Sequence, residues 1–152
     1  MSKVAVFPGS FDPFTIGHHG LVMKALPLFD KIIVAVGQNS TKQPVFDNQK
    51  RLEALRKLYH GQVKIEIVTF SGLTVDLCKK HNAHFILRGL RNGTDFDYEK
   101  SIANMNKRMH SELETIFLIT DPEHECVSST IVREIYKNGG NITQFLPAGY
   151  SI

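Results

Sequence analysis

The first apolar segment of the chain is followed by a turn rich in groups that can bind phosphate. The stretch VFPGSFDPFTIGHHG, residues 6–20, contains Gly9, Ser10, Gly17 and His18. A glycine lets the backbone turn tightly and approach a ligand, and a serine adds a hydroxyl donor. Gly17 and His18 open an apolar helical pattern, and a helix start attracts anions. The turn therefore predicts that His18 donates to a phosphoryl oxygen; the alternative is a helix cap with an incidental histidine.

Two arginines follow another apolar segment. Arg88 and Arg91 flank Gly89 in the stretch LRGLRNGTDFDYE, residues 87–99. Two guanidinium groups around a glycine can hold two phosphate groups with paired hydrogen bonds. The alternative is a structural cluster, because the same stretch holds acids that suit a helix start and could pair with the arginines. These acids are Asp95, Asp97 and Glu99.

Two more segments carry groups of the same kind. Lys42 lies in a polar loop, where it is either a phosphate ligand or simply solvated. Ser128, Ser129 and Thr130 stand at the start of a helical pattern. One of these serines suffices as an N-cap, so three hydroxyls together with free backbone N–H groups predict a second anion site.

Alternating apolar segments indicate how these groups come together. Continuous apolar strands that alternate with helices predict an α/β fold, a single doubly wound, Rossmann-like, five-stranded parallel sheet with helices on both faces. The expected strands are 3–7, 31–37, 63–70, 84–89 and 114–120, and the expected helices are 17–29, 47–59, 73–81, 94–109 and 128–137. Pro27 should kink or end the first helix early. In such a sheet the ligand lies at the carboxyl ends of the strands, where all these polar groups are found.

The bulk composition argues against several classes of protein. The 152 residues fit one domain, 1–152, and 42% hydrophobic and 22% charged residues are ordinary for a globular protein. A net charge of +3 does not suggest nucleic-acid binding but tolerates anionic ligands. No apolar run is long enough for a membrane span, and the start of the chain lacks a signal-peptide pattern, so we expect a cytoplasmic protein. Cys78 and Cys126 have no metal-like spacing and are expected to be reduced.

The motifs, in their order, resemble those of one enzyme family. PGSFDPFTIGH resembles the nucleotide-binding signature of the nucleotidyltransferases related to class I aminoacyl-tRNA synthetases. Together with TKQPVF, LRGLRNGTDFDYE and SST-IVRE it is similar to the bacterial phosphopantetheine adenylyltransferases over essentially the whole chain. The resemblance implies transfer of AMP from ATP to 4′-phosphopantetheine, giving dephospho-coenzyme A and pyrophosphate. It also implies that Mg²⁺ is held mainly by the substrate phosphates and that the chain forms a homohexamer. Coenzyme A is implied as a product or feedback ligand.

The resemblance assigns roles to particular residues. His18 would stabilise the transition state, helped by Ser10, Lys42 and Arg91. The implied ATP contacts are Ser10, Phe11, Gly17, His18, Gly89, Leu90, Arg91, Glu99, His124, Glu125, Cys126, Val127, Ser128, Ser129 and Thr130. The implied contacts to the second substrate are Ser10, Lys42, Leu73, Thr74, Arg88, Met105 and Asn106.

The chain departs from the family pattern in a few places. Ser10 replaces the commoner threonine and Thr130 a usual serine, and both keep the hydroxyl. His124 replaces an aromatic ring expected near adenine, and the segment FLPAGYSI, residues 145–152, is shorter than the usual tail. Three other functions fit parts of the sequence: a nucleotidyltransferase with a different acceptor or CTP, a silent nucleotide- or coenzyme A-binding module, and a flavodoxin-like electron carrier.

Overall fold

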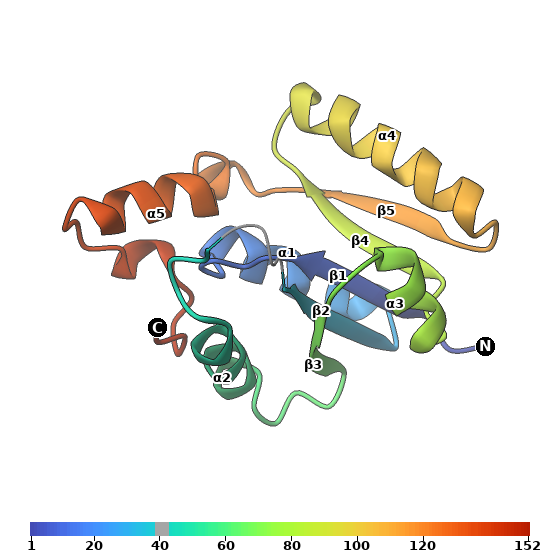
Figure 1. Cartoon of the computed structure of the whole chain (residues 1–152), viewed down its shortest axis with the longest axis horizontal. Helices are drawn as coiled ribbons and strands as arrows, with labels where there is room; N and C mark the ends of the chain where they lie inside the picture. The colour runs from blue at the N-terminus through green and yellow to red at the C-terminus, as the bar shows by residue number, and fades with distance from the viewer. Residues whose placement is uncertain (39–42) are drawn as a thin grey trace.

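The computed structural model, which describes residues 1–38 and 43–152, contains one parallel sheet (Figure 1). Its strand order is β3-β2-β1-β4-β5, and every neighbouring pair is parallel. The strands are β1 (Val4–Gly9), β2 (Lys31–Gly37), β3 (Ile65–Phe70), β4 (Phe85–Leu90) and β5 (Glu114–Ile119). The doubly wound five-stranded sheet predicted from the alternation is therefore confirmed.

Helices join consecutive strands, and their ends follow local sequence signals. The α-helices are α1 (Ile16–Ala25), α2 (Asn48–Leu58), α3 (Thr74–Lys80), α4 (Gly93–Met109) and α5 (Ser129–Lys137). Short 3₁₀ turns are η1 (Leu26–Leu28), η2 (Pro122–His124) and η3 (Thr143–Phe145). The first helix ends at Ala25, just before Pro27, and continues only as η1. The expected range 17–29 was thus too long, and the expected early ending is confirmed.

Side-chain oxygens cap four of the α-helices, the first being α1, which is capped by Thr15. Asp47 accepts a hydrogen bond from the backbone of Lys50 at the start of α2. Asn92 caps α4, and Ser128 caps α5 by accepting from the backbone N–H of Ile131. These caps satisfy backbone donors that a helix start leaves free.

Two apolar clusters cover the two faces of the sheet. Leu21, Val22 and Leu55 of α1 and α2 pack on one face, against residues such as Val34. Val75, Leu77 and Cys78 of α3 pack on the other face, against residues such as Ile33. Alternate residues of each central strand thus face opposite clusters, as expected for a sheet buried on both sides.

The sheet splits between the neighbouring strands β1 and β4. β1 pairs with β4 only through Ala5 and Val6. Beyond that point β1 continues beside β2 as far as Gly9, and β4 continues beside β5 as far as Leu90. The chain order reverses at this place, so the split is the switch point at which α/β sheets bind ligands.

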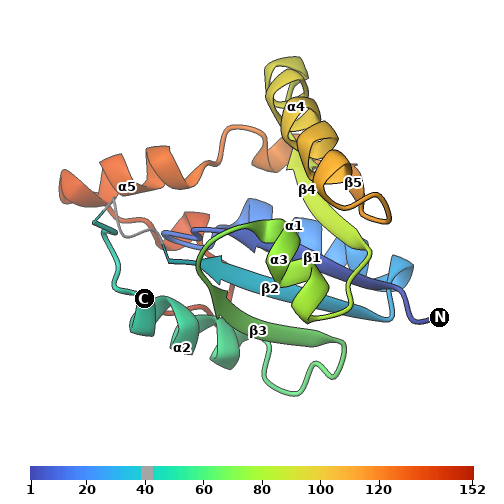
Figure 2. The ribbon, with the colours of Figure 1, turned by 45° about the vertical axis from the view of Figure 1, so that its right-hand side comes forward.

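The helix α4 lies at one end of the molecule, against β4 and β5. Figures 1 and 2 show it beyond β4 and β5, far from α2. Only Glu99 is buried among its 17 residues. No helix in the described part of the chain is long and apolar enough to cross a membrane.

Candidate active site

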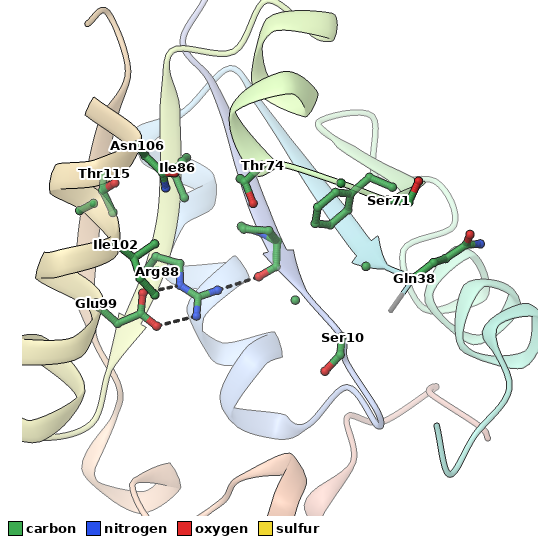
Figure 3. Close-up of a pocket in the computed structure, with 16 residues that line it drawn as sticks. Ser10, Gln38, Ser71, Thr74, Ile86, Arg88, Glu99, Ile102, Asn106 and Thr115 are labelled. Carbon is green, nitrogen blue, oxygen red and sulfur yellow. Dashed lines mark hydrogen bonds and ion pairs between the residues drawn. The ribbon is translucent and has the colours of Figure 1, made fainter. Parts of the chain in front are cut away.

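The split between β1 and β4 leads into two cavities. The first, here called the α4 cavity, has a volume of about 580 Å³ and lies between the strand ends, the start of α3 and the inner face of α4 (Figure 3). The second, the His18 cavity, has about 320 Å³ and lies between the β1–α1 turn, the end of β4 and the start of α5. The residues that line both are Pro8, Gly9, Ser10, Arg88 and Glu99. Two ligands bound in these cavities would meet beside Ser10 and Arg88.

His18 is held in one orientation and one protonation state. Its Nδ1 accepts a hydrogen bond from the backbone N–H of Thr15 at 2.9 Å, and the Thr15 hydroxyl accepts from the backbone of His18. Because Nδ1 is an acceptor, the ring proton resides on Nε2. Burial first, and then the charges of Arg88 and Arg91, lower the pKa of His18 to about 3. His18 is therefore a neutral imidazole whose Nε2–H is a fixed donor.

Three phenylalanine rings surround the imidazole. The ring centroids of Phe11 and Phe14 lie 5.0 and 5.3 Å from that of His18, and Phe7 lies at 6.2 Å. Phe11 has a φ of 47°, a left-handed backbone that a bulky residue adopts only at a cost. A Cβ at Gly9 would lie 2.7 Å from the Phe11 ring. In this structure, then, Gly9 makes room for a ring that orients His18.

Arg88 spans the split in the sheet. Its Nη1 donates to the Pro8 carbonyl of β1 at 2.8 Å, and its Nε and Nη2 donate to the Glu99 carboxylate at 2.9 and 2.7 Å (Figure 3). A guanidinium has five N–H groups, so two remain after these three bonds. Glu99 thus acts as the partner of an arginine, which was the structural alternative for this acid, while Arg88 keeps donors for a ligand.

Arg91 is also paired with an acid. Its Nε donates to Asp95 at 3.1 Å, and the Asp95 carboxylate also accepts from the backbone N–H of Arg91. Both residues line the His18 cavity, as does Gly89. The arginines are therefore both fixed by acids and close enough to His18 to depress its pKa.

At the start of α5 one serine caps the helix, as expected, and the other two hydroxyls also have protein partners. Ser128 caps the helix, and the Ser129 hydroxyl donates to the Pro13 carbonyl at 2.8 Å. The Thr130 hydroxyl accepts from Arg133, and Thr130 does not line the cavity. In the described part of the chain Ser129 alone uses its O–H as a donor, so the donors available to the cavity at this helix start are the backbone N–H groups and the O–H of Ser128, which only accepts in its cap.

One face of α4 forms a wall of the α4 cavity. Glu99, Ile102, Ala103 and Asn106 line it, and their spacing of three and four residues places them on one side of the helix. Thr74, at the start of α3, lines the cavity on the other side. Leu73 and Met105 do not line the cavity and are more than half exposed. Lys42 lies outside the described residues.

Several residues implied for ATP do not line the His18 cavity. Phe11, Gly17 and Val127 line it, but Leu90, His124, Glu125 and Cys126 do not. The Nδ1 atom of His124 would be 3.4 Å from a Cβ at Gly20, so the imidazole rests on the α1 backbone. His124 therefore packs against a helix in this structure.

Sequence comparisons identify the family. A cytidylyltransferase-like family model matches residues 6–135. A phosphopantetheine adenylyltransferase from Leptospira biflexa is 51% identical over 147 residues, covering 97% of this chain and 92% of that protein. One from Cytophaga hutchinsonii is 45% identical, covering 97% and 98%. The chain belongs to the phosphopantetheine adenylyltransferase family. It is therefore a nucleotidyltransferase, which confirms the resemblance seen in its motifs and removes the electron-carrier alternative.

The fold agrees with membership of the phosphopantetheine adenylyltransferase family. A crystal structure of a bifunctional NMN adenylyltransferase/ADP ribose pyrophosphatase from Francisella tularensis matches with a TM-score of 0.72. The two chains are 18% identical, and the match covers 96% of this chain and 45% of that one. At this identity the likeness supports the fold alone.

The structure adds residues of this family member that its motifs did not reveal. Ile86, Ile102 and Thr115 line the α4 cavity, and Asp95 and Thr15 line the His18 cavity. The helical spacing from Glu99 to Asn106 was a usable signal for Ile102. No local sequence pattern indicated that Thr15 and Thr115 would line the cavities, because their positions there depend on which backbone atom or strand lies beside them.

Proposed function

We propose that the protein transfers AMP from ATP to 4′-phosphopantetheine in coenzyme A biosynthesis, forming dephospho-coenzyme A and pyrophosphate. Family membership supports the reaction class. The observation that carries the proposal is that two cavities meet at Ser10 and Arg88, beside the neutral donor His18. One cavity holds the nucleotide, and the other holds the acceptor.

The acceptor phosphate attacks the α-phosphorus of ATP in line with the departing pyrophosphate. A phosphate monoester has a second pKa of about 6, so its oxygen is already an anionic nucleophile and needs no general base. No covalent enzyme intermediate is required. Catalysis then consists of positioning the anions and stabilising the charge that develops during transfer. A neutral Nε2–H of His18 can donate to the transferring phosphoryl group without first having to lose or gain a proton.

The two cavities suit their ligands chemically. The two remaining N–H groups of Arg88 lie at the junction and suit the acceptor phosphate, while Arg91 and the start of α5 suit the outer phosphates of ATP. The α4 cavity combines apolar Ile86 and Ile102 with polar Thr74 and Asn106. Such a mixture fits the pantetheine arm, which alternates methylene and amide groups.

Mg²⁺ belongs to the proposal as a partner of the substrate phosphates. Among the described residues of the His18 cavity, the carboxylates are Asp95 and Glu99, and both are paired with arginines. Mg²⁺ prefers phosphate, carboxylate and water oxygens. The phosphates of ATP, rather than protein side chains, would therefore supply most of its ligands. The ion would neutralise phosphate charge, and Arg88, Arg91 and His18 would still position the reacting groups.

Self-association is a further part of the proposal. α4 leaves Tyr98, Met105 and Met109 exposed at spacings of seven and four residues, which group them on one side of the helix, and a grouped apolar surface favours contact with another protein. We expect a second copy of this chain there, within the homohexamer implied by the family resemblance.

Coenzyme A is expected as a feedback ligand, and the free thiols of Cys78 and Cys126 suit a cytoplasmic enzyme.

Pyrophosphate release tests the reaction. Purified protein is incubated with Mg-ATP, with and without 4′-phosphopantetheine, and dephospho-coenzyme A is identified by its mass. Release that depends on 4′-phosphopantetheine supports the proposal. Release with CTP and glycerol 3-phosphate but not with 4′-phosphopantetheine would assign the chain a different acceptor. ATP binding without release from any acceptor would favour a silent binding module.

A further inference from the structure

Arg51 is a buried cation that the reaction described so far does not use. Its side chain leaves α2 and is 3% exposed. Nε donates to the backbone carbonyl of Phe46 at 3.0 Å, and Nη1 donates to the backbone carbonyl of Ser10. The guanidinium therefore joins α2 to the β1–α1 turn through the Ser10 carbonyl, while the Phe46 carbonyl fixes it to the segment just before α2.

Within the described residues, the guanidinium of Arg51 makes no ion pair. Over residues 1–38 and 43–152, no carboxylate lies within 4.0 Å of its guanidinium nitrogens. The nearby buried acid, Asp12, instead accepts hydrogen bonds from the backbone of Val45 and Phe46, both at 2.9 Å. Buried charged side chains are almost always paired, because removing a charge from water is costly. Asp12 compensates part of this charge without an ion pair, and an anion bound near Ser10 would add to that compensation.

The residue that Arg51 holds stands where the cavities meet. Ser10 lines the α4 cavity, the His18 cavity and a third cavity of about 590 Å³, which Arg51 itself lines. The Ser10 carbonyl accepts from Arg51, whereas Arg51 itself lines neither of the two cavities assigned to the substrates. Other carbonyls of this turn are held in the same way, since Asp12 accepts from Arg133 and Pro13 accepts from Ser129.

We propose that Arg51 is a positioning residue for adenylyl transfer: it fixes Ser10 at the junction of the cavities and supplies a buried positive charge that the substrate phosphates help to balance. Arg51 acts through Ser10 and does not touch the substrate. This role rests on the proposed function. It predicts that the position and charge of Arg51 affect the rate of the chemical step more than they affect ATP binding.

The variant Arg51→Lys tests the role, with Arg56→Lys as the matched control. Lysine keeps the charge but has a single ammonium group, which cannot bond both carbonyls with the geometry of a guanidinium. We expect kcat to fall at least about tenfold, with the KM for ATP within about threefold and an unchanged far-UV circular dichroism spectrum. Arg56 is an exposed arginine of the same helix, so its variant should keep kcat within about twofold. A folded Arg51→Lys enzyme with wild-type kcat overturns the role, even if its melting temperature is lower.

The wild-type protein allows a second measurement that needs no folded variant. The Nε–H signals of Arg51 and Arg56 are assigned by NMR, and Mg-ATP is added to saturation. The role predicts a shift of the Arg51 signal and exchange with water slowed at least threefold, while the Arg56 signal stays the same. An unchanged Arg51 signal overturns it. Turnover of the wild-type enzyme is measured in parallel. An inactive wild type contradicts the proposed function. An active wild type with an equally active Arg51→Lys variant contradicts only the role of Arg51.

Discussion

The β1–α1 turn and the helix α4 form opposite sides of the same site, but they are held very differently. In the turn, Phe11, Asp12, Phe14 and Thr15 are all buried, and its backbone is bound by side chains from α2, α5 and the C-terminal segment. In α4, by contrast, Glu99 is the only buried residue. The reacting groups are thus placed on a fixed support, and the wall of the acceptor cavity is a helix with few ties to the core.

This difference corresponds to two requirements of the reaction. Stabilising a transition state requires donors that are in place before the reaction begins, because moving them during the reaction adds to the barrier. Enclosing a long, flexible arm requires a wall that can yield when the ligand enters and leaves. Changes in the turn should therefore reduce kcat, and changes in α4 should mainly raise the KM for the acceptor.

Removing the imidazole of His18 should have the largest effect. In His18→Ala we expect kcat to fall by roughly 10²–10³, because the lost Nε2–H donor acts on charge that develops in the transition state. The KM for ATP should change far less. Steady-state kinetics with both substrates checks this, and equal losses in ATP affinity and rate would make His18 a plain binding residue.

The ion pair between Arg88 and Glu99 attaches α4 to the sheet beside the β1–α1 turn. The variant Glu99→Gln therefore tests how strongly this pair anchors α4. The neutral amide loses one charge and one good acceptor, and we expect the free energy of unfolding to fall by about 1–2 kcal/mol, less than for a fully buried pair. The KM for the acceptor should rise about tenfold. Thermal unfolding and kinetics check both expectations.

Asp97→Asn is the control for this change, because Asp97 is an exposed acid on the same helix. It removes the same charge without breaking the pair to Arg88. If both variants change the acceptor KM equally, the effect comes from net charge, and α4 is not anchored through Glu99.

The sequence predicted the turn side of the site better than the helix side. Gly17 and His18 were recognisable because a helix start after a buried strand is a local pattern, and the structure has them there. On α4 the resemblance implied both Met105 and Asn106, yet only Asn106 lines the cavity. Adjacent helical residues point about 100° apart, so the two cannot face the same direction. The spacing from Glu99 already favoured Asn106.

Other features depend on contacts between distant segments and could not be predicted from local patterns. Ser129 lines the His18 cavity, but its hydroxyl donates to Pro13, and the Thr130 hydroxyl accepts from Arg133 outside that cavity. Arg51 was part of an ordinary helical pattern, and its role depends on Ser10 lying beside it. The doubly wound parallel sheet, in contrast, was predicted from the alternation of elements, because right-handed crossovers allow few arrangements, and the structure adds the strand order.

The neutral state of His18 has a consequence for stability at low pH. Its pKa is about 3 in the folded protein and about 6.5 when unfolded, so below pH 6.5 the unfolded chain binds a proton that the folded protein does not. Stability should therefore decrease as the pH falls from about 6.5 towards 3, and the contribution of His18 should reach about 1–2 kcal/mol at pH 5. Urea unfolding at pH 8 and pH 5 measures it.

His18→Gln is the comparison for this measurement. Glutamine does not titrate, so the variant should lose less stability than the wild type between pH 8 and pH 5. Burial also lowers the pKa of the neighbouring His19, but that contribution is present in both proteins and cancels. Parallel losses in the two proteins would mean that His18 is readily protonated and that the turn is more open than this structure indicates.

The smallest expected effect concerns adjacent residues of α4 and tests how far this helix moves. Asn106→Ala removes a polar group from the cavity wall, and the KM for 4′-phosphopantetheine should rise about fivefold, as for one lost hydrogen bond. Met105 is 58% exposed and outside the cavity, so Met105→Ala should leave this KM within about twofold. If Met105→Ala raises the KM as much as Asn106→Ala does, the helix turns when the acceptor binds, and the contrast between a fixed turn and a yielding wall becomes stronger. If neither variant changes it, the acceptor does not use this face of α4.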